Sequence, residues 1–219
     1  MPWFYYFARF LVRLVLFLFT RWQVNGKENI PVQGPLLVVS NHLSLADPPI
    51  ISVSLDRITL FMAKEELFRS RLSNYFIRNF GAFPVYRGRL DRRALRQAER
   101  ILSEGTALVM FPESTRSKNT QLQSAYPGSA LIASRNDVPI LPIGISGTEI
   151  IKGWFWLLRY PKITVNIGTS FRLPPANGKL TRADLAEPTN LMMEHIAELL
   201  PIKYRGNYAV KSVPADNES

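Results

Sequence analysis

Gly34-Pro-Leu-Leu-Val-Val-Ser-Asn-His-Leu-Ser-Leu-Ala-Asp-Pro-Pro49 is the stretch from which the rest of this sequence is best understood. Its apolar run, from Leu36 to Val39, is bounded by Gly and Pro and predicts a short buried strand. His42 follows the end of this strand, and Asp47 comes five residues later, before two prolines. Because ligands of open α/β sheets bind where strands end, the stretch predicts a functional site there.

The spacing of His42 and Asp47 restricts how their side chains can meet. Residues five apart are rotated by about 140° on a helix and lie about 16 Å apart on a strand, so contact requires a turn. In such a turn the carboxylate would fix the imidazole tautomer, and the other ring nitrogen could take a proton from a hydroxyl. The alternative is structural: His42 bonds a backbone carbonyl, and Asp47 caps a helix that begins at Pro48. The spacing alone leaves both open.

Helices and strands alternate from residue 35 to 167, which predicts an α/β fold with a mixed sheet flanked by helices. Prolines within the segment 138–145 favour an edge or bulged position for that strand. The expected strands are 36–39, 58–62, 82–86, 106–111, 138–145 and 163–167. The expected helices are 49–55, 63–80, 91–103, 128–135 and 189–200, with Pro188 before the last one.

Polar clusters follow three further predicted strands. Lys64 comes after the second strand, and Arg87 closes the segment Gly81-Ala-Phe-Pro-Val-Tyr-Arg87 after the third. The fourth runs into Phe111-Pro-Glu-Ser-Thr-Arg-Ser117, which supplies a carboxylate, hydroxyls and a guanidinium. Two arginines with Ser and Thr donors can hold a phosphate, because the planar guanidinium binds phosphate oxygens in pairs. The convergence of four strand ends predicts an anion-binding site beside His42.

The N-terminal segment, residues 3–22, is the most apolar and carries Arg9, Arg13 and Arg21 but no acidic residue. Arg9 and Arg13 are one helical turn apart, which leaves an aromatic and leucine-rich face opposite them. This pattern favours an interfacial helix among anionic headgroups, although a single membrane span stays open because about 20 apolar residues suffice for one. A second aromatic segment, Trp154-Phe-Trp-Leu-Leu-Arg-Tyr160, is either core or a second membrane contact.

The composition indicates an anionic partner, because the 219 residues carry a net charge of +10. Nucleic acid is the weakest candidate, since no binding module is recognisable and the aromatic residues lie in apolar runs. The absence of Cys excludes disulfides and thiolate nucleophiles, and two distant His residues argue against a metal site. The expected helix 91–103 carries an arginine cluster that is either an anion contact or a plainly solvated face: Arg92, Arg93, Arg96 and Arg100.

The ordered motifs resemble those of the glycerolipid acyltransferases. Asn41-His42 with Asp47 is similar to the H-x4-D motif of that family. Further segments are similar to the family's later motifs and to the lead-in of the second: Lys64-Glu-Glu-Leu-Phe68, Gly81 to Arg87, Phe111 to Ser117 and Val138-Pro-Ile-Leu-Pro142. The resemblance covers about residues 25–170, and four motifs in order are more specific than any single short pattern.

The resemblance implies a glycerol-3-phosphate acyltransferase-like fold and the transfer of a fatty acyl group to the hydroxyl of lysophosphatidic acid. Acyl-CoA or an acyl-carrier protein would be the donor, with no cofactor and no metal. His42 would be the general base and Asp47 would orient it. The positions that match substrate-binding residues of the family are Lys64, Arg87, Glu113, Ser114, Thr115 and Arg116.

Two departures from the family pattern bear on the substrate. Ser114 stands where the third motif normally has Gly, and a positive φ at that position would strain a serine and change the loop that selects the acceptor. Tyr126-Pro127 stands where the family usually carries Phe and Lys before Gly128.

We therefore expect a membrane anchor over residues 1–24, an acyltransferase domain over 25–205 and a flexible tail over 206–219. The protein would associate with an anionic membrane surface, at the cytoplasmic face of the cell membrane. Another lysophospholipid, glycerol-3-phosphate or an amino-lipid stays open as the acceptor. From a different class, a non-catalytic protein could bind anionic membranes through the N-terminal helix and three arginines: Arg92, Arg93 and Arg96.

Overall fold

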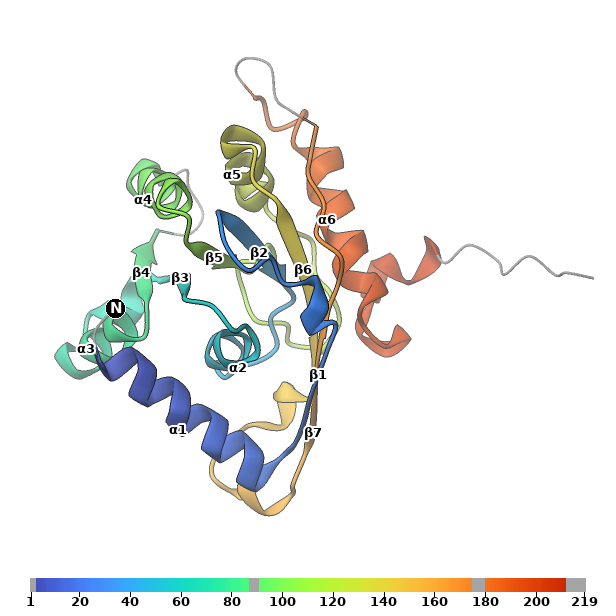
Figure 1. Ribbon diagram of the computed structural model, residues 1–219. Helices are drawn as coiled ribbons and strands as arrows, with labels where there is room; N and C mark the ends of the chain where they lie inside the picture. The colour runs from blue at the N-terminus through green and yellow to red at the C-terminus, as the bar shows by residue number, and fades with distance from the viewer. Residues whose placement is uncertain (1–2, 87–90, 175–179, 212–219) are drawn as a thin grey trace, which may run out of the picture.

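One seven-stranded sheet forms the centre of the molecule, with strand order β1-β7-β6-β2-β5-β3-β4 (Figure 1). The computed structural model describes residues 3–86, 91–174 and 180–211. Neighbouring strands pair in parallel except β6 and β7, which are antiparallel. The strands are β1 (Arg21–Asn25), β2 (Leu36–Ser40), β3 (Thr59–Lys64), β4 (Ala82–Val85), β5 (Ala107–Met110), β6 (Ile140–Ser146) and β7 (Lys162–Ile167).

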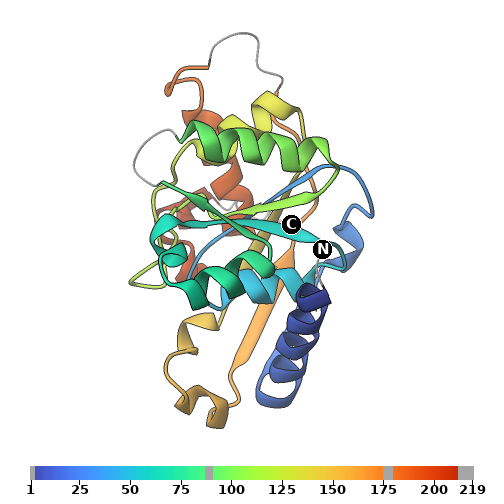
Figure 2. The ribbon, with the colours of Figure 1, turned by 90° about the vertical axis from the view of Figure 1, so that its left-hand side faces the viewer.

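Helices cover both faces of the sheet, which confirms the predicted α/β class (Figures 1 and 2). On β2, Leu37 and Val39 pack into the core beneath α4, α5 and α6, whereas Leu36 and Val38 pack against α1 and α2. This alternation explains why every residue of β2 is buried. The helices are α1 (Trp3–Phe19), α2 (Asp47–Ser54), α3 (Arg71–Asn79), α4 (Arg92–Ser103), α5 (Gly128–Asn136) and α6 (Ala186–Glu198).

The predicted single helix over residues 63–80 is wrong. β3 continues to Lys64, a 3-10 turn covers Glu65–Phe68, and α3 begins only at Arg71. Lys64 pairs with Val85 of β4, so hydrogen bonding between strands keeps the end of β3 extended. Tertiary pairing thus overrides a local sequence that suits a helix.

Of the two positions predicted for the strand around Pro142, the edge is wrong, because β6 lies between β7 and β2, whereas the bulged alternative agrees with the pairing. The ladder is irregular beside Pro142: β6 advances three residues from Ile140 to Ile143, while its partner segment runs back four, from Phe171 to Ile167. The carbonyl of Pro142 still accepts a bond from Gly168 N at 3.0 Å. A central strand therefore tolerates this proline because the pairing shifts where proline has no N–H to donate.

Two boundaries differ from the sequence-based expectation. β1 is not among the predicted strands, and it forms the sheet edge by pairing in parallel with β7. α6 begins at Ala186, so Pro188 lies in its first turn and not before the helix. Proline is tolerated there because the N–H groups of the first turn have no partner within the helix.

α1 turns its arginines toward the protein and its aromatic residues outward. Arg9 is only 9% exposed and donates to the carbonyls of Leu55 and Arg57, both at 2.7 Å. Arg13 donates to the carbonyl of Val53 and pairs with the Asp56 carboxylate at 3.0 Å. The two arginines therefore lie on the face of α1 that packs on the protein, opposite the aromatic and leucine-rich face. They cap the C-terminal end of α2, where cations are favoured.

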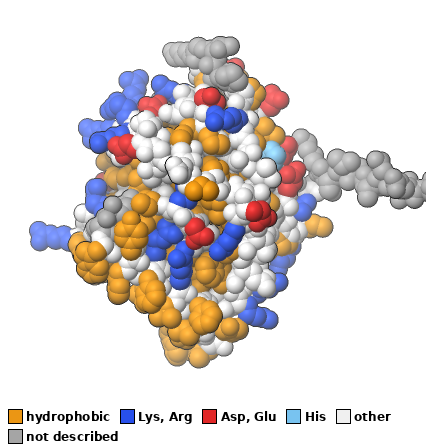
Figure 3. All heavy atoms as spheres, in the orientation of Figure 1, with side chains coloured by type: hydrophobic (Ala, Val, Ile, Leu, Met, Phe, Trp, Pro, Cys, Tyr) orange, Lys and Arg blue, Asp and Glu red, His pale blue; other side chains and the backbone are white. Residues whose placement is uncertain are grey.

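The outward face of α1 exposes many large apolar side chains. Figure 3 shows hydrophobic side chains gathered at the lower end of the molecule, where α1 lies in Figure 1. No helix in residues 3–86, 91–174 or 180–211 has the length and hydropathy that a membrane crossing requires. The exposed side chains of α1 include Trp3, Tyr6, Phe7, Phe10, Leu14, Phe17 and Leu18.

Candidate active site

His42 and Asp47 meet in a buried pair just beyond β2. Their Nδ1 and Oδ2 atoms lie 2.8 Å apart, so the partner of the ring is the carboxylate and not a backbone carbonyl. A carboxylate accepts hydrogen bonds, so Nδ1 carries the ring proton and Nε2 presents a lone pair. Nε2 forms no hydrogen bond with the described residues. This arrangement can accept a proton at Nε2.

The carboxylate of Asp47 also builds the turn that brings it to the ring. Its Oδ2 atom accepts the backbone N–H groups of Leu43 and Ser44, at 2.6 and 2.7 Å. Its Oδ1 atom accepts the hydroxyl of Thr148, at 2.5 Å. Asp47 is the first residue of α2 and is fully buried. The turn therefore positions the carboxylate for the ring and compensates its negative charge at the same time.

The neighbouring strands β5 and β6 hold the end of β2 in place. Asn41 donates its side-chain amide to the carbonyl of Ile145 at 2.9 Å, and Ile145 N donates back to Asn41 Oδ1 at 2.8 Å. On the other side, Ser117 N donates to the carbonyl of His42 at 2.8 Å. The ring of Phe111 stacks on the His42 ring with centroids 4.2 Å apart. These contacts fix the backbone and the plane of the imidazole.

Glu113, predicted to contact the substrate, bonds the backbone of the site in this structure. The residue is only 2% exposed. One carboxylate oxygen accepts the N–H of His42 and the other accepts the N–H of Gln123, both at 2.9 Å. Burial raises the pKa of Glu113 to about 7. The two hydrogen bonds act to lower this pKa, and the nearby Asp47 carboxylate acts to raise it. Glu113 therefore ties the His42 turn to the loop before α5.

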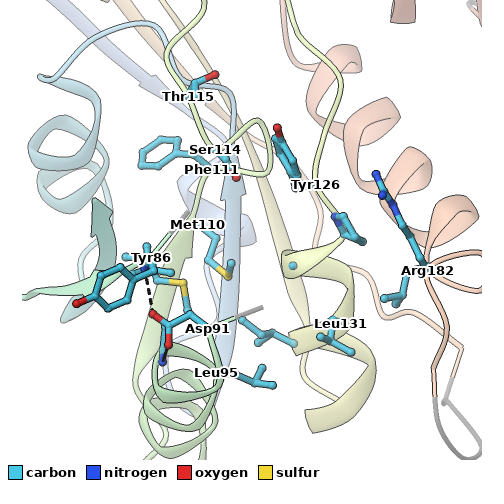
Figure 4. A pocket seen from close by; sticks show the side chains of 17 residues that line it. Tyr86, Asp91, Leu95, Met110, Phe111, Ser114, Thr115, Tyr126, Leu131 and Arg182 are labelled. Carbon is cyan, nitrogen blue, oxygen red and sulfur yellow. Dashed lines mark hydrogen bonds between the residues drawn. The ribbon is translucent and has the colours of Figure 1, made fainter. Parts of the chain in front are cut away.

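A cavity of about 450 Å³ opens beside the pair (Figure 4). Phe111 connects the two, because it stacks on His42 and also lines the cavity. In Figure 4, Phe111, Ser114 and Tyr126 lie toward one end of the cavity, and Leu95 and Leu131 lie toward the other. Most lining side chains are apolar, so the cavity suits a hydrocarbon chain. They include Met62, Val85, Leu95, Met110, Leu131 and Ile132.

The remaining predicted site residues are placed differently from one another. Ser114 and Thr115 line the cavity, and Ser114 has the positive φ, 57°, that its replacement of Gly put in question. Arg116 is exposed and precedes Ser117, which is bonded to the His42 backbone. Lys64 does not line the cavity and pairs with Glu66 at 3.0 Å. Arg87 lies outside the described residues.

Sequence reasoning missed Thr148 and Phe111, although both obey the rule that identified His42. Each follows the end of a strand that neighbours β2: Phe111 comes directly after β5, and Thr148 comes after β6 and Gly147. Applying the strand-end rule to every predicted strand would have included them. Within the described ranges, no group of three or more His, Cys, Asp or Glu side chains could hold a metal ion.

Comparisons with known proteins agree on one family. Residues 21–146 match the model of the Acyltransferase family. The chain is 31% identical over 174 residues to a 1-acyl-sn-glycerol-3-phosphate acyltransferase of Streptococcus pneumoniae, covering 75% of this chain and 61% of that one. It is 25% identical over 197 residues to the protein of the same name from Bacillus subtilis, covering 89% of this chain and 96% of that one.

A solved structure agrees with the sequence comparisons. The crystal structure of the 1-acyl-sn-glycerophosphate acyltransferase PlsC from Thermotoga maritima matches with a TM-score of 0.68 and 30% identity, over 89% of this chain and 79% of that one. The lengths of the relatives vary. The chain spans 61% of the Streptococcus pneumoniae protein and 42% of a chloroplastic relative from Brassica napus, but nearly all of the Bacillus subtilis protein.

Proposed function

The chain belongs to the acyltransferase family, and on that premise we propose that it acylates the sn-2 hydroxyl of 1-acylglycerol-3-phosphate to give phosphatidic acid. Acyl-CoA or an acyl-carrier protein would donate the acyl group. The observation that carries the proposal is the buried His42–Asp47 pair, whose Nδ1 to Oδ2 distance is 2.8 Å and whose Nε2 is unpaired among the described residues. The names of the relatives support lysophosphatidic acid as the acceptor.

The reaction needs a base and then an acid, and one imidazole can be both. The acceptor hydroxyl attacks the thioester carbonyl while its proton moves to Nε2 of His42. The hydrogen bond from Nδ1 to Asp47 stabilises the imidazolium that forms. When the tetrahedral intermediate collapses, the carbon–sulfur bond breaks and the imidazolium returns the proton to the thiolate. The products are an ester and a thiol, so no covalent intermediate with the protein is required.

The substrate would be held by charge at one end and by apolar burial at the other. We assign the acceptor phosphate to Arg116, beside the His42 backbone, and to Arg87 at the position that matches the family motif. The apolar cavity lined by Phe111 and Leu131 would take an acyl chain. Its volume of about 450 Å³ lies within the usual range of pockets for small molecules, about 300–1,000 Å³.

We also propose that the protein works at an anionic membrane surface, facing the cytoplasm, because its substrates are lipids. The outward aromatic and leucine face of α1 supports this, since an interfacial helix buries such a face at the boundary of headgroups and acyl chains. The inward arginines leave this face free of charge along its length.

The test is thiol release from acyl-CoA or acyl-carrier protein, with and without acceptor. Native protein should release thiol only when lysophosphatidic acid is present. His42→Ala should lower kcat at least about 100-fold, because a positioned general base contributes that much or more. Asp47→Asn should also lower kcat, since an amide can leave the ring in the wrong tautomer. His195→Ala, which changes the other histidine of the chain, serves as the matched control.

A panel of acceptors separates the remaining alternatives. Faster turnover of another lysophospholipid, of glycerol-3-phosphate or of an amino-lipid would reassign the acceptor while keeping the chemistry. Binding to acidic vesicles without any thiol release would favour the non-catalytic membrane protein. Unchanged kcat in a folded His42→Ala protein would contradict the mechanism.

A further inference from the structure

The segment between β6 and β7, residues 147–161 (here the β6–β7 loop), begins at the end of the sheet where β2 finishes and His42 follows. β6 runs parallel to β2, with Ser40 in register with Ile143, so the two strands end side by side. The beginning of the loop touches the catalytic pair, because Thr148 donates to Asp47 at 2.5 Å. Its end meets the start of β1, two residues past the end of α1, since Arg21 N donates to the carbonyl of Pro161 at 2.9 Å. The loop therefore connects the site to the segment that follows the C-terminal end of α1.

The tip of the β6–β7 loop exposes large apolar side chains and is not part of the core. Trp154 is 62% exposed, Phe155 58% and Leu158 76%, so the core interpretation of this segment is wrong. The rings of Trp154 and Phe155 stack with centroids 4.0 Å apart, and a 3-10 helix covers Phe155–Leu158. A folded loop that keeps three such residues in water requires a partner for them.

Four exposed cations lie in the β6–β7 loop or at its base. None of them forms an ion pair with a residue that the structure describes. Two belong to the first paired positions of β1 and β7, so they lie side by side at the base of the loop. Exposed aromatic residues with basic residues nearby in the same loop match the boundary of an anionic bilayer, where apolar groups enter and cations meet phosphate. The four exposed residues are Arg21, Lys152, Arg159 and Lys162.

We propose that the β6–β7 loop is a second membrane-docking element, which inserts Trp154, Phe155 and Leu158 into an anionic phospholipid bilayer. The inference rests on the proposed function, because it assumes a membrane-borne substrate. The loop and the C-terminal end of α1 lie at the same end of the molecule in Figures 1 and 2, so one bilayer can contact both. With both α1 and the loop in contact with the bilayer, the protein cannot rotate about the axis of α1. Docking would thus set the orientation of the sheet edge that carries His42.

Vesicle sedimentation of two loop variants tests this element. Trp154→Ser/Phe155→Ser/Leu158→Ser should bind vesicles that contain phosphatidylglycerol at least about tenfold more weakly than native protein. Lys152→Gln/Arg159→Gln/Lys162→Gln should bind about fivefold more weakly for each charge removed, on anionic vesicles only. Val32→Ser/Ile202→Ser is the matched control, because it removes exposed apolar side chains outside α1 and the loop.

Thiol release with detergent-dispersed lysophosphatidic acid, measured on the same samples, separates this inference from the proposed function. A loop variant that keeps this activity but loses vesicle binding supports the inference. Native-like vesicle binding by the apolar variant would overturn it, as would equal affinity of native protein for neutral phosphatidylcholine vesicles. A dimer of native protein that dissociates in the apolar variant would assign the tip to a second copy instead. Inactive native protein would refute the function, while the vesicle measurement would still test the loop.

Discussion

Asp47 carries much of the organisation of the site, because its buried carboxylate accepts four hydrogen bonds. Three come from its own turn, from His42, Leu43 and Ser44. The fourth comes from Thr148, which follows the end of β6. An unpaired buried carboxylate would cost several kcal/mol. These four bonds therefore offset the cost of burial and hold the carboxylate against the His42 ring.

Glu113 should make stability depend on pH in an unusual direction. Its pKa is about 7 in the folded protein, because burial raises it from the ordinary glutamate value of 4.5. Between these values the folded state binds more protons than the unfolded state, so the free energy of unfolding falls as pH rises. The contribution is complete below about pH 4.5 and is lost by about pH 7, a change on the order of 3 kcal/mol. Glu113→Gln should flatten the profile across this window.

Denaturant unfolding of both proteins between pH 4.5 and 8 measures the effect. The difference between their profiles isolates Glu113, since every other ionisable group is present in both proteins. Glu187→Gln, which changes an exposed glutamate, should keep the native slope. Parallel profiles for native protein and Glu113→Gln would contradict the assignment.

At this scale the sequence predicted the local contacts and missed the distant ones. The spacing of His42 and Asp47 showed that only a turn could join them, although it left a structural alternative open. The bond from Thr148 and the inward direction of Glu113 could not be predicted, since both depend on the register of β2 with its neighbours. Glu113 lies in a motif that resembles a phosphate site and was therefore predicted to contact the substrate. In the fold its buried carboxylate accepts backbone N–H groups.

Among the elements, α1 and α2 act as one unit through their arginine contacts. Arg9 and Arg13 bond carbonyls at the C-terminal end of α2, and Asp47 is the first residue of that helix. The sequence predicted both helices but not which face of α1 turns inward. Arginines usually seek water, and here backbone carbonyls of the chain itself take the place of solvent or headgroups.

Arg9→Met should therefore destabilise the fold by about 2–4 kcal/mol, because it leaves the carbonyls of Leu55 and Arg57 without their donor. Arg9→Lys should recover only part of this, since an ammonium lacks the planar fork that reaches both oxygens. Denaturant unfolding gives the free energies. Arg13→Met is the matched control and should cost less than half as much, because that side chain is 45% exposed. Equal losses for the two variants would show that burial of Arg9 is not the cause.

Across the whole molecule, the helices on the two faces of the sheet hold two membrane-binding candidates apart, the arginines of α4 and the apolar face of α1. The composition alone cannot show this separation. α4, which carries Arg92, Arg93 and Arg96, packs on the face opposite to α1 (Figure 2). One flat membrane therefore cannot use both in the way that the non-catalytic alternative assumed. The net charge of +10 is a property of the chain, whereas the position of each cation follows from the order in which helices cross the sheet. Sequence pattern gives the fold class but not this distribution.

The charge and the apolar face of α1 should contribute to membrane binding in ways that salt can separate. Raising the ionic strength from 0.1 to 1 M shortens the Debye length from about 10 to about 3 Å, which weakens attraction to anionic vesicles but not apolar insertion. Native protein should therefore keep part of its vesicle binding at 1 M salt. Phe10→Ser/Phe17→Ser should lose most of this salt-resistant binding, because these outward side chains are 62% and 76% exposed. Val32→Ser, at another exposed apolar site, should behave like native protein. Salt-resistant binding that survives in the double variant would mean that α1 is not the inserted face.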